Sequence, residues 1–167
     1  ASFDNCEDYL QRFGGTVHSV ALSRCWDKSV LSMTLVARHC TNLCDLTMFY
    51  CDLSFCVDIL KSSTLLRSID ITSDPQSRHF MHWDSLATHH LQIASIKLHC
   101  SSRDEEVILG MCDPLCVHRL RLKNSQRPQW QSFVNLRSFG YQYDSRIQDA
   151  NLLVNVCTLC PWIVNLD

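Results

Sequence analysis

Two short pairs of residues in this chain have a spacing that could support metal or redox chemistry. Cys157 and Cys160 form a Cys-x-x-Cys pair, which occurs in redox motifs and as half of a zinc site. His79 and His82 are three residues apart, which places two histidines on one face of a helix. No second Cys-x-x-Cys exists to complete four ligands, and the histidine spacing matches no known zinc signature. We therefore expect a structural cysteine pair, a solvated histidine face, and neither a metal nor a cofactor.

Other catalytic patterns are missing from the sequence. The chain has only four glycines and no glycine-rich phosphate loop, and no serine nucleophile motif is present. Acidic residues 104–106 are interpreted as the start of a helix, where the helix dipole favours negative charge. We therefore expect that the protein is not an enzyme. A metal or redox enzyme stays an alternative that metal analysis of the purified protein would test.

The eleven cysteines occupy positions that suit reduced, structural thiols. Disulfide-rich scaffolds are poor in core residues, whereas this chain is rich in Leu, Ile and Val. Several cysteines also recur at fixed places in a sequence pattern, where a thiol acts as a small apolar side chain. We therefore expect a reducing compartment and an intracellular protein, cytoplasmic or nuclear.

That pattern is apolar-x-x-apolar-x-apolar-x-x-(Cys, Ser or Asp), which occurs six times and begins a seventh time before the end. Its central apolar residues recur every 19 to 27 residues, at Val20, Leu46, Ile69, Ile96, Leu120, Phe139 and Leu166. This period matches the leucine-rich repeat, in which a strand and a helix or turn form each coil of a solenoid. We predict an α/β solenoid with a curved parallel sheet inside and helices outside. It forms a single domain over residues 1–167, in about six full repeats plus the start of a seventh.

The segments between the copies predict the outer helices. Apolar residues three and four apart indicate helices over 29–40, 53–62, 78–89, 104–111 and 146–157. Residues 3–13 predict a helix that covers the first coil and stops at Gly14. Residues 126–130 contain Pro128 and are too few for a full helix, so we expect a single turn there, with Trp130 and Phe133 filling the space.

The stretch from Ala37 to Met48 ends a helix in Cys40 and continues as Leu-x-x-Leu-x-Leu. It resembles the cysteine-containing leucine-rich repeats of F-box proteins. That resemblance implies that the repeats hold a target protein while an F-box docks onto a ubiquitin ligase. No F-box-like segment precedes the first copy, so a ubiquitin-ligase adaptor is expected only if an F-box lies outside this segment. Because the chain lacks an initiator Met and stops inside a pattern, we expect it to be a fragment of a longer protein.

The predicted inner wall of the sheet carries the candidate binding site. Residues between the apolar positions point onto this wall, because strand side chains alternate between faces. Acidic Asp45 and Asp70 mark the early coils, whereas cations gather on the fourth and fifth coils, roughly 5 Å apart. Exposed aromatic residues are typical of binding anchors. The partner-binding residues predicted from the sequence are Lys97, His99, Arg119, Arg121, Lys123, Phe49, Tyr50 and Tyr143.

These observations lead to two functional hypotheses. The first is a protein-protein interaction module that grips an acidic segment of a partner, with substrate recognition in an SCF-type ubiquitin ligase as the role implied by the resemblance. The second is a structural or assembly-factor subunit of a larger complex, held through the helices or the end coils. The resemblance to short family members without an F-box implies a mitochondrial complex, and hence a mitochondrial location, as the alternative. The formal charge of −2 argues against nucleic acid as a partner, and no apolar run reaches the ~20 residues that span a membrane.

Overall fold

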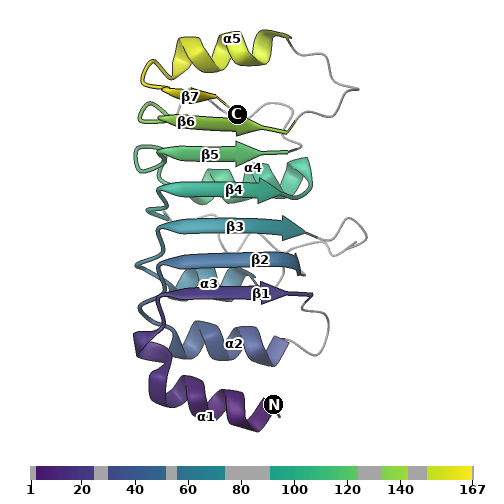
Figure 1. Ribbon diagram of the computed structural model, residues 1–167, viewed down its shortest axis with the longest axis vertical. Coiled ribbons are helices and arrows are strands. Elements are labelled where there is room, and N and C mark those ends of the chain that lie inside the picture. The colour runs from purple at the N-terminus through teal and green to yellow at the C-terminus, as the bar shows by residue number, and fades with distance from the viewer. Residues whose placement is uncertain are drawn as a thin grey trace.

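The fold is built on one parallel β-sheet (Figure 1). A computed structural model describes residues 3–24, 30–51, 56–73, 91–123, 133–142 and 150–166. Its seven strands are hydrogen-bonded in chain order, and each pairs in parallel with the next. They are β1 (Ser19–Ser23), β2 (Asp45–Cys51), β3 (Ser68–Ser73), β4 (Ser95–His99), β5 (Arg119–Leu122), β6 (Ser138–Tyr141) and β7 (Asn165–Leu166). The α/β class and the parallel sheet predicted from the sequence are confirmed.

Two helices precede the first strand, and the other four lie between strands in the chain. They are α1 (Phe3–Phe13), the 3-10 helix η1 (Gly14–Thr16), α2 (Val30–His39), α3 (Cys56–Ser62), α4 (Ser102–Met111) and α5 (Ala150–Leu159). Figure 1 shows α3 and α4 behind the sheet, with α1 and α5 at its two ends. The helices predicted over 3–13, 29–40, 53–62, 104–111 and 146–157 correspond to α1 through α5. The predicted helix over 78–89 and the predicted turn over 126–130 lie outside the described residues.

The apolar positions of the sequence pattern form two straight rows across the sheet. The central residue of each copy pairs directly with the central residue of the next strand, from Val20 to Leu166. The apolar residue two positions later does the same from Leu22 to Tyr141. The inner members of both rows are buried and belong to one hydrophobic core. Burying each such side chain contributes about 1.5–3 kcal/mol, which makes this register the main source of stability.

The backbone repeats the same hydrogen bonds from strand to strand. The carbonyl of the residue before each strand accepts two consecutive N–H groups of the next segment. His18 O, for example, accepts from Cys44 N at 2.8 Å and from Asp45 N at 3.0 Å. Asparagine side chains add a second link, since Asn42 Nδ2 donates to Gly15 O at 2.6 Å and Asn135 Nδ2 makes the equivalent bond to the carbonyl of residue 115 at 2.8 Å. These bonds fix the spacing of the segments as well as their register.

One buried position near the end of the helices takes cysteine in some segments and serine in another. Cys40 and Cys160 each end a helix, are 1% exposed, and accept an N–H from the residue three positions later. Ser63 makes the same backbone bonds and is 2% exposed. Its Oγ has no hydrogen-bond partner in the part of the chain that the structure describes. A buried hydroxyl without a partner costs free energy that a thiol of similar size does not.

We therefore expect Ser63→Cys to stabilise the protein by about 1 kcal/mol. The reverse change at the equivalent position, Cys160→Ser, should destabilise it by a similar amount. Urea unfolding followed by circular dichroism measures both. Ser19→Cys, at an exposed position of β1, is the matched control and should change the free energy of unfolding by less than about 0.5 kcal/mol. An unchanged midpoint for Ser63→Cys would show that the hydroxyl is solvated.

Candidate partner-binding face

The alternate residues of the strands form the face of the sheet that lies away from the core, here called the polar face. The residues of this face pair with residues of the next strand in the same register as the buried apolar rows. Lys97 on β4 lies between Asp70 on β3 and Arg121 on β5, and Arg119 is two residues before Arg121 on the same strand. Lys123 follows the end of β5. The sheet therefore brings together the four cations that the sequence predicted as a cluster.

The nearest acidic side chain already binds one of these cations. Lys97 Nζ lies 2.7 Å from Asp70 Oδ2, and the two side chains are 36% and 25% exposed. A pair this exposed contributes at most about 1 kcal/mol to stability, but it neutralises Lys97 locally. Arg119, Arg121 and Lys123 are exposed and form no ion pair with any residue that the structure describes. The positive charge offered to a partner is thus concentrated on β5; we call these three residues the β5 cations.

Gly140 gives the side chain of Arg121 a defined place to lie. The two residues are paired across β5 and β6. A Cβ atom added at Gly140 would be 3.1 Å from Arg121 Cγ, which is closer than ordinary van der Waals contact. The aliphatic part of Arg121 therefore covers the backbone of β6, which explains why Gly140 is buried on an otherwise accessible face. The charged group of Arg121 is held over β6 by this packing.

Lys123 is tied to the helix behind the sheet by a buried carboxylate. Its N–H donates to Glu105 Oε1 at 3.3 Å, and Glu105 is fully buried. Glu105 lies in the first turn of α4, where Ser101 is the N-cap and its Oγ accepts the N–H of Asp104 at 3.3 Å. The predicted acidic helix start is confirmed, and Ser101, in the last position of the pattern, bonds to the backbone where the chain turns into α4. Glu105 also fixes the chain where it leaves β5, which sequence reasoning missed.

His99 lies next to these cations but carries no charge at neutral pH. Burial lowers the pKa of His99 below its usual value of 6.5, and Lys97, Lys123 and Arg121 lower it further, while Asp70 opposes the change. His99 Nε2 is buried and has no hydrogen-bond partner among the described residues. A proton on this ring would be placed beside several cations. His99 is therefore a neutral neighbour of the β5 cations.

Two aromatic residues extend the site toward the other end of the sheet. Phe49 is 39% exposed and Tyr50 is 49% exposed at the end of β2. The pairing of β2 with β3 shifts between Phe49 and Cys51, so that Tyr50 is an extra residue in the strand. Its φ is 52°, in the left-handed region that disfavours residues with a side chain. The third predicted aromatic residue, Tyr143, lies outside the described part of the chain.

The cysteines are better suited to packing than to chemistry. The nine cysteines whose side chains the structure describes are thiols, and six of them are buried. Burial raises the pKa of the Cys56 and Cys112 thiols to about 12. Such thiols are protonated at neutral pH and therefore poor nucleophiles and metal ligands. Cys51, in the last position of the pattern, donates to the carbonyl of Leu22 at 3.6 Å, which links two neighbouring segments.

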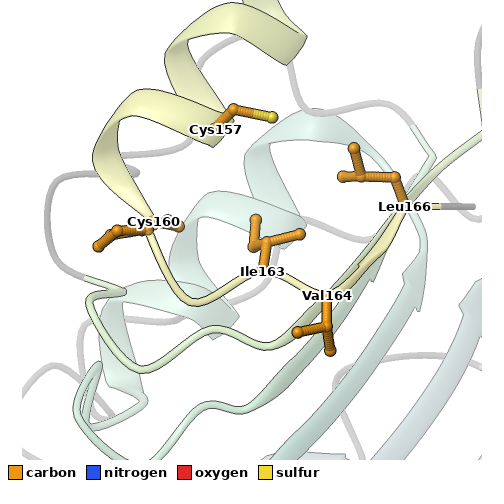
Figure 2. A pocket seen from close by; sticks show the side chains of 6 residues that line it. Cys157, Cys160, Ile163, Val164 and Leu166 are labelled. Atoms are coloured by element: carbon orange, nitrogen blue, oxygen red, sulfur yellow. The ribbon is translucent and has the colours of Figure 1, made fainter.

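The Cys-x-x-Cys pair is found at the end of the sheet beside β7. Cys157 in α5 and Cys160 after it border a hollow of about 340 Å³ together with Ile163, Val164 and Leu166 (Figure 2). No third metal-binding side chain joins them, and no group of three His, Cys, Asp or Glu side chains occurs anywhere in the described ranges. The predicted histidine pair of residues 79 and 82 lies outside those ranges.

Comparison with protein-family models, with curated proteins and with solved structures finds no match for this chain. Within the described residues, none of the helices has the length and apolar character needed to cross a bilayer.

The environment of His99 predicts how stability depends on pH. Because the pKa of His99 is lowered by folding, the unfolded chain binds more protons than the folded chain as the pH falls below 6.5. The stability associated with neutral His99 is therefore present above pH 6.5 and is lost as the pH falls through the lowered pKa. His99→Gln should reduce the loss of stability on acidification.

Chemical unfolding measured at neutral pH and at about pH 5 tests this expectation, since the unperturbed histidine pKa lies between those values. The control is Gln11→Asn, a change between neutral amides at an exposed position of α1. That variant should keep the pH dependence of the wild type. An identical loss of stability in His99→Gln and the wild type would contradict the assignment.

Proposed function

We propose that this chain is a leucine-rich repeat solenoid that acts as a protein-protein interaction module. Its polar face would be the concave wall of the solenoid and would bind an acidic segment of a partner protein. The strand order, the single register and the 19- to 27-residue period support the repeat architecture. Repeat solenoids commonly use such a wall for binding, because each coil adds one strand to a continuous surface.

The β5 cations are the observation that carries this proposal. Arg119, Arg121 and Lys123 come from a single strand and its exit and are exposed, and their side chains form no ion pair with any described residue. By contrast, the fourth cation of the predicted cluster is already neutralised by Asp70. The chain as a whole has a formal charge of −2, so these cations form a local feature and not a general basic character. A local positive patch favours an acidic segment over a long polyanion.

Substrate recognition in an SCF-type ubiquitin ligase is the biological role that we propose for this binding. It rests on the similarity of the cysteine-containing pattern to the repeats of F-box proteins. In that role the β5 cations would hold the substrate, and an F-box outside this segment would contact the ubiquitin-ligase adaptor. We also propose an intracellular location, because the buried thiols suit a reducing compartment.

Arg121→Glu tests the proposed binding face directly. The change reverses one charge in the middle of the β5 cations and should slow association with an acidic partner and weaken its salt dependence. Proteins captured from a cell extract by the wild type and by the variant are compared by quantitative mass spectrometry. Arg12→Glu makes the same change of charge on the exposed surface of α1, far from the polar face. If captured proteins are lost with Arg121→Glu but kept with Arg12→Glu, the proposal is supported. Equal capture by the wild type and both variants would exclude this face from the interface.

A further inference from the structure

We infer that the acidic segment bound by this protein is extended, runs across the strands, and carries an apolar side chain about four residues from its acidic side chain. The inference rests on the proposed function and specifies the ligand of the same face. It follows from three features of the polar face: a row of residues that crosses four strands, an aromatic pair at one end of that row, and cations at the other.

The row begins at Phe49 and ends at Lys123. Phe49 on β2 pairs with Thr72 on β3, which pairs with His99 on β4. Lys123 continues the row beyond the paired residues Leu98 and Leu122 of β4 and β5. Three strand spacings of about 4.8 Å separate the two ends, which gives roughly 14 Å. An extended peptide covers that distance in about four residues, at about 3.3–3.4 Å per residue.

The charges of the face give this row a direction. One exposed cation, Arg24, follows β1 beside Phe49, since its backbone N–H donates to Phe49 O at 2.8 Å. Three exposed cations lie together at the other end, so the β5 cations are the stronger attraction for an acidic group of the ligand. Between the two ends, Thr72 is uncharged and His99 is neutral at physiological pH. The middle of the ligand therefore needs no charge to cross the row.

The aromatic end has the properties of an anchor for an apolar side chain. Phe49 lies between two small polar residues, Ser23 and Thr72, which leave its ring accessible on both sides. Tyr50 follows it, with half of its surface exposed and no hydrogen bond or ring contact in the described structure. Aromatic residues of this kind are frequent at the energetic centres of protein interfaces.

The backbone of Tyr50 strengthens this interpretation. Arg24 occupies the same place at the end of β1 and has the same φ of 52°, so the left-handed conformation belongs to the turn of the chain and not to tyrosine. Glycine or asparagine adopts that conformation at lower cost. Tyrosine at this position therefore helps neither the turn nor the core. The remaining contribution of the residue is an exposed aromatic ring next to Phe49.

The test uses fluorescein-labelled peptides made of serine and glycine, each with two adjacent glutamates and one leucine. In the first peptide the leucine is about four residues from the glutamates, as the strand spacing requires. In the second it is directly beside them, and in the third it is at about twice the distance of the first. A further peptide has the glutamates alone. Fluorescence anisotropy should show that the peptide with the four-residue spacing, in one of its two chain directions, binds at least about fivefold more tightly than the others.

Tyr50→Asn provides the matched variant, because asparagine suits a positive φ and the fold should be at least as stable in thermal unfolding. It should remove the preference for spacing and leave the affinity for the glutamate-only peptide unchanged. Tyr9→Asn, at another exposed tyrosine on α1, should keep the preference.

Each possible result decides one point. Binding that is independent of leucine position and of Tyr50 overturns the inference and leaves the proposed function standing. Failure of every glutamate peptide to bind overturns the acidic-segment proposal itself. A single-stranded RNA oligonucleotide is the remaining probe, since bases also stack on exposed aromatic rings beside cations. Tighter binding of that RNA than of any peptide would overturn both.

Discussion

The arrangement of this protein depends on one constraint, the register of its parallel strands. Each strand pairs residue for residue with the next, and the carbonyl before each strand takes two N–H groups from the segment that follows. Side chains alternate between the two faces, so a slip of one residue would move every apolar side chain of a strand onto the polar face. The two buried apolar rows make that slip costly. Segments of unequal length, separated by 19 to 27 residues, are thus held to one geometry.

The same register determines the chemistry of the polar face, because residues at equivalent positions in successive segments become neighbours. Asp70 and Lys97 are 27 residues apart in the chain but meet in an ion pair. Arg121 and Gly140 meet in the same row, and the absence of a side chain at Gly140 lets the arginine stem pack across β6. A substitution on one strand therefore acts first on the strands beside it. Gly140 and Asp70 shape the cation cluster although neither carries a positive charge.

The sequence was sufficient to predict the sheet, because its information is periodic. The apolar patterns centred on Leu46, Ile69 and Ile96 repeat with the same internal spacing. The alternation of side chains along a strand then assigns the residues between the apolar positions to the opposite face. That reasoning correctly placed the cations together. It did not show that Asp70 neutralises Lys97, since the pairing of two side chains depends on their rotamers as well as on their positions.

Three further features depend on three-dimensional detail that no pattern contains. Glu105 was expected only to complement the dipole of a helix, yet it is buried and holds the backbone of Lys123. The unsatisfied hydroxyl of Ser63 follows from complete burial at the end of α3. The left-handed conformation of Tyr50 belongs to the turn at the end of the strand and recurs at Arg24. Each of these three residue types is common on protein surfaces. Only the position of the neighbouring segments shows that the residue has a structural role here.

The distribution of charge and aromatic surface explains why neither end of the polar face would suffice alone. Exposed cations in water contribute little to affinity, because they are well solvated and are screened over about 8 Å at physiological ionic strength. They select the sign of the ligand and speed its approach. Phe49 and Tyr50 offer apolar area that salt does not screen, but they do not discriminate between ligands by charge. A ligand that reaches both ends gains affinity from the rings and selectivity from the β5 cations. The neutral stretch through Thr72 and His99 sets the distance that such a ligand must span.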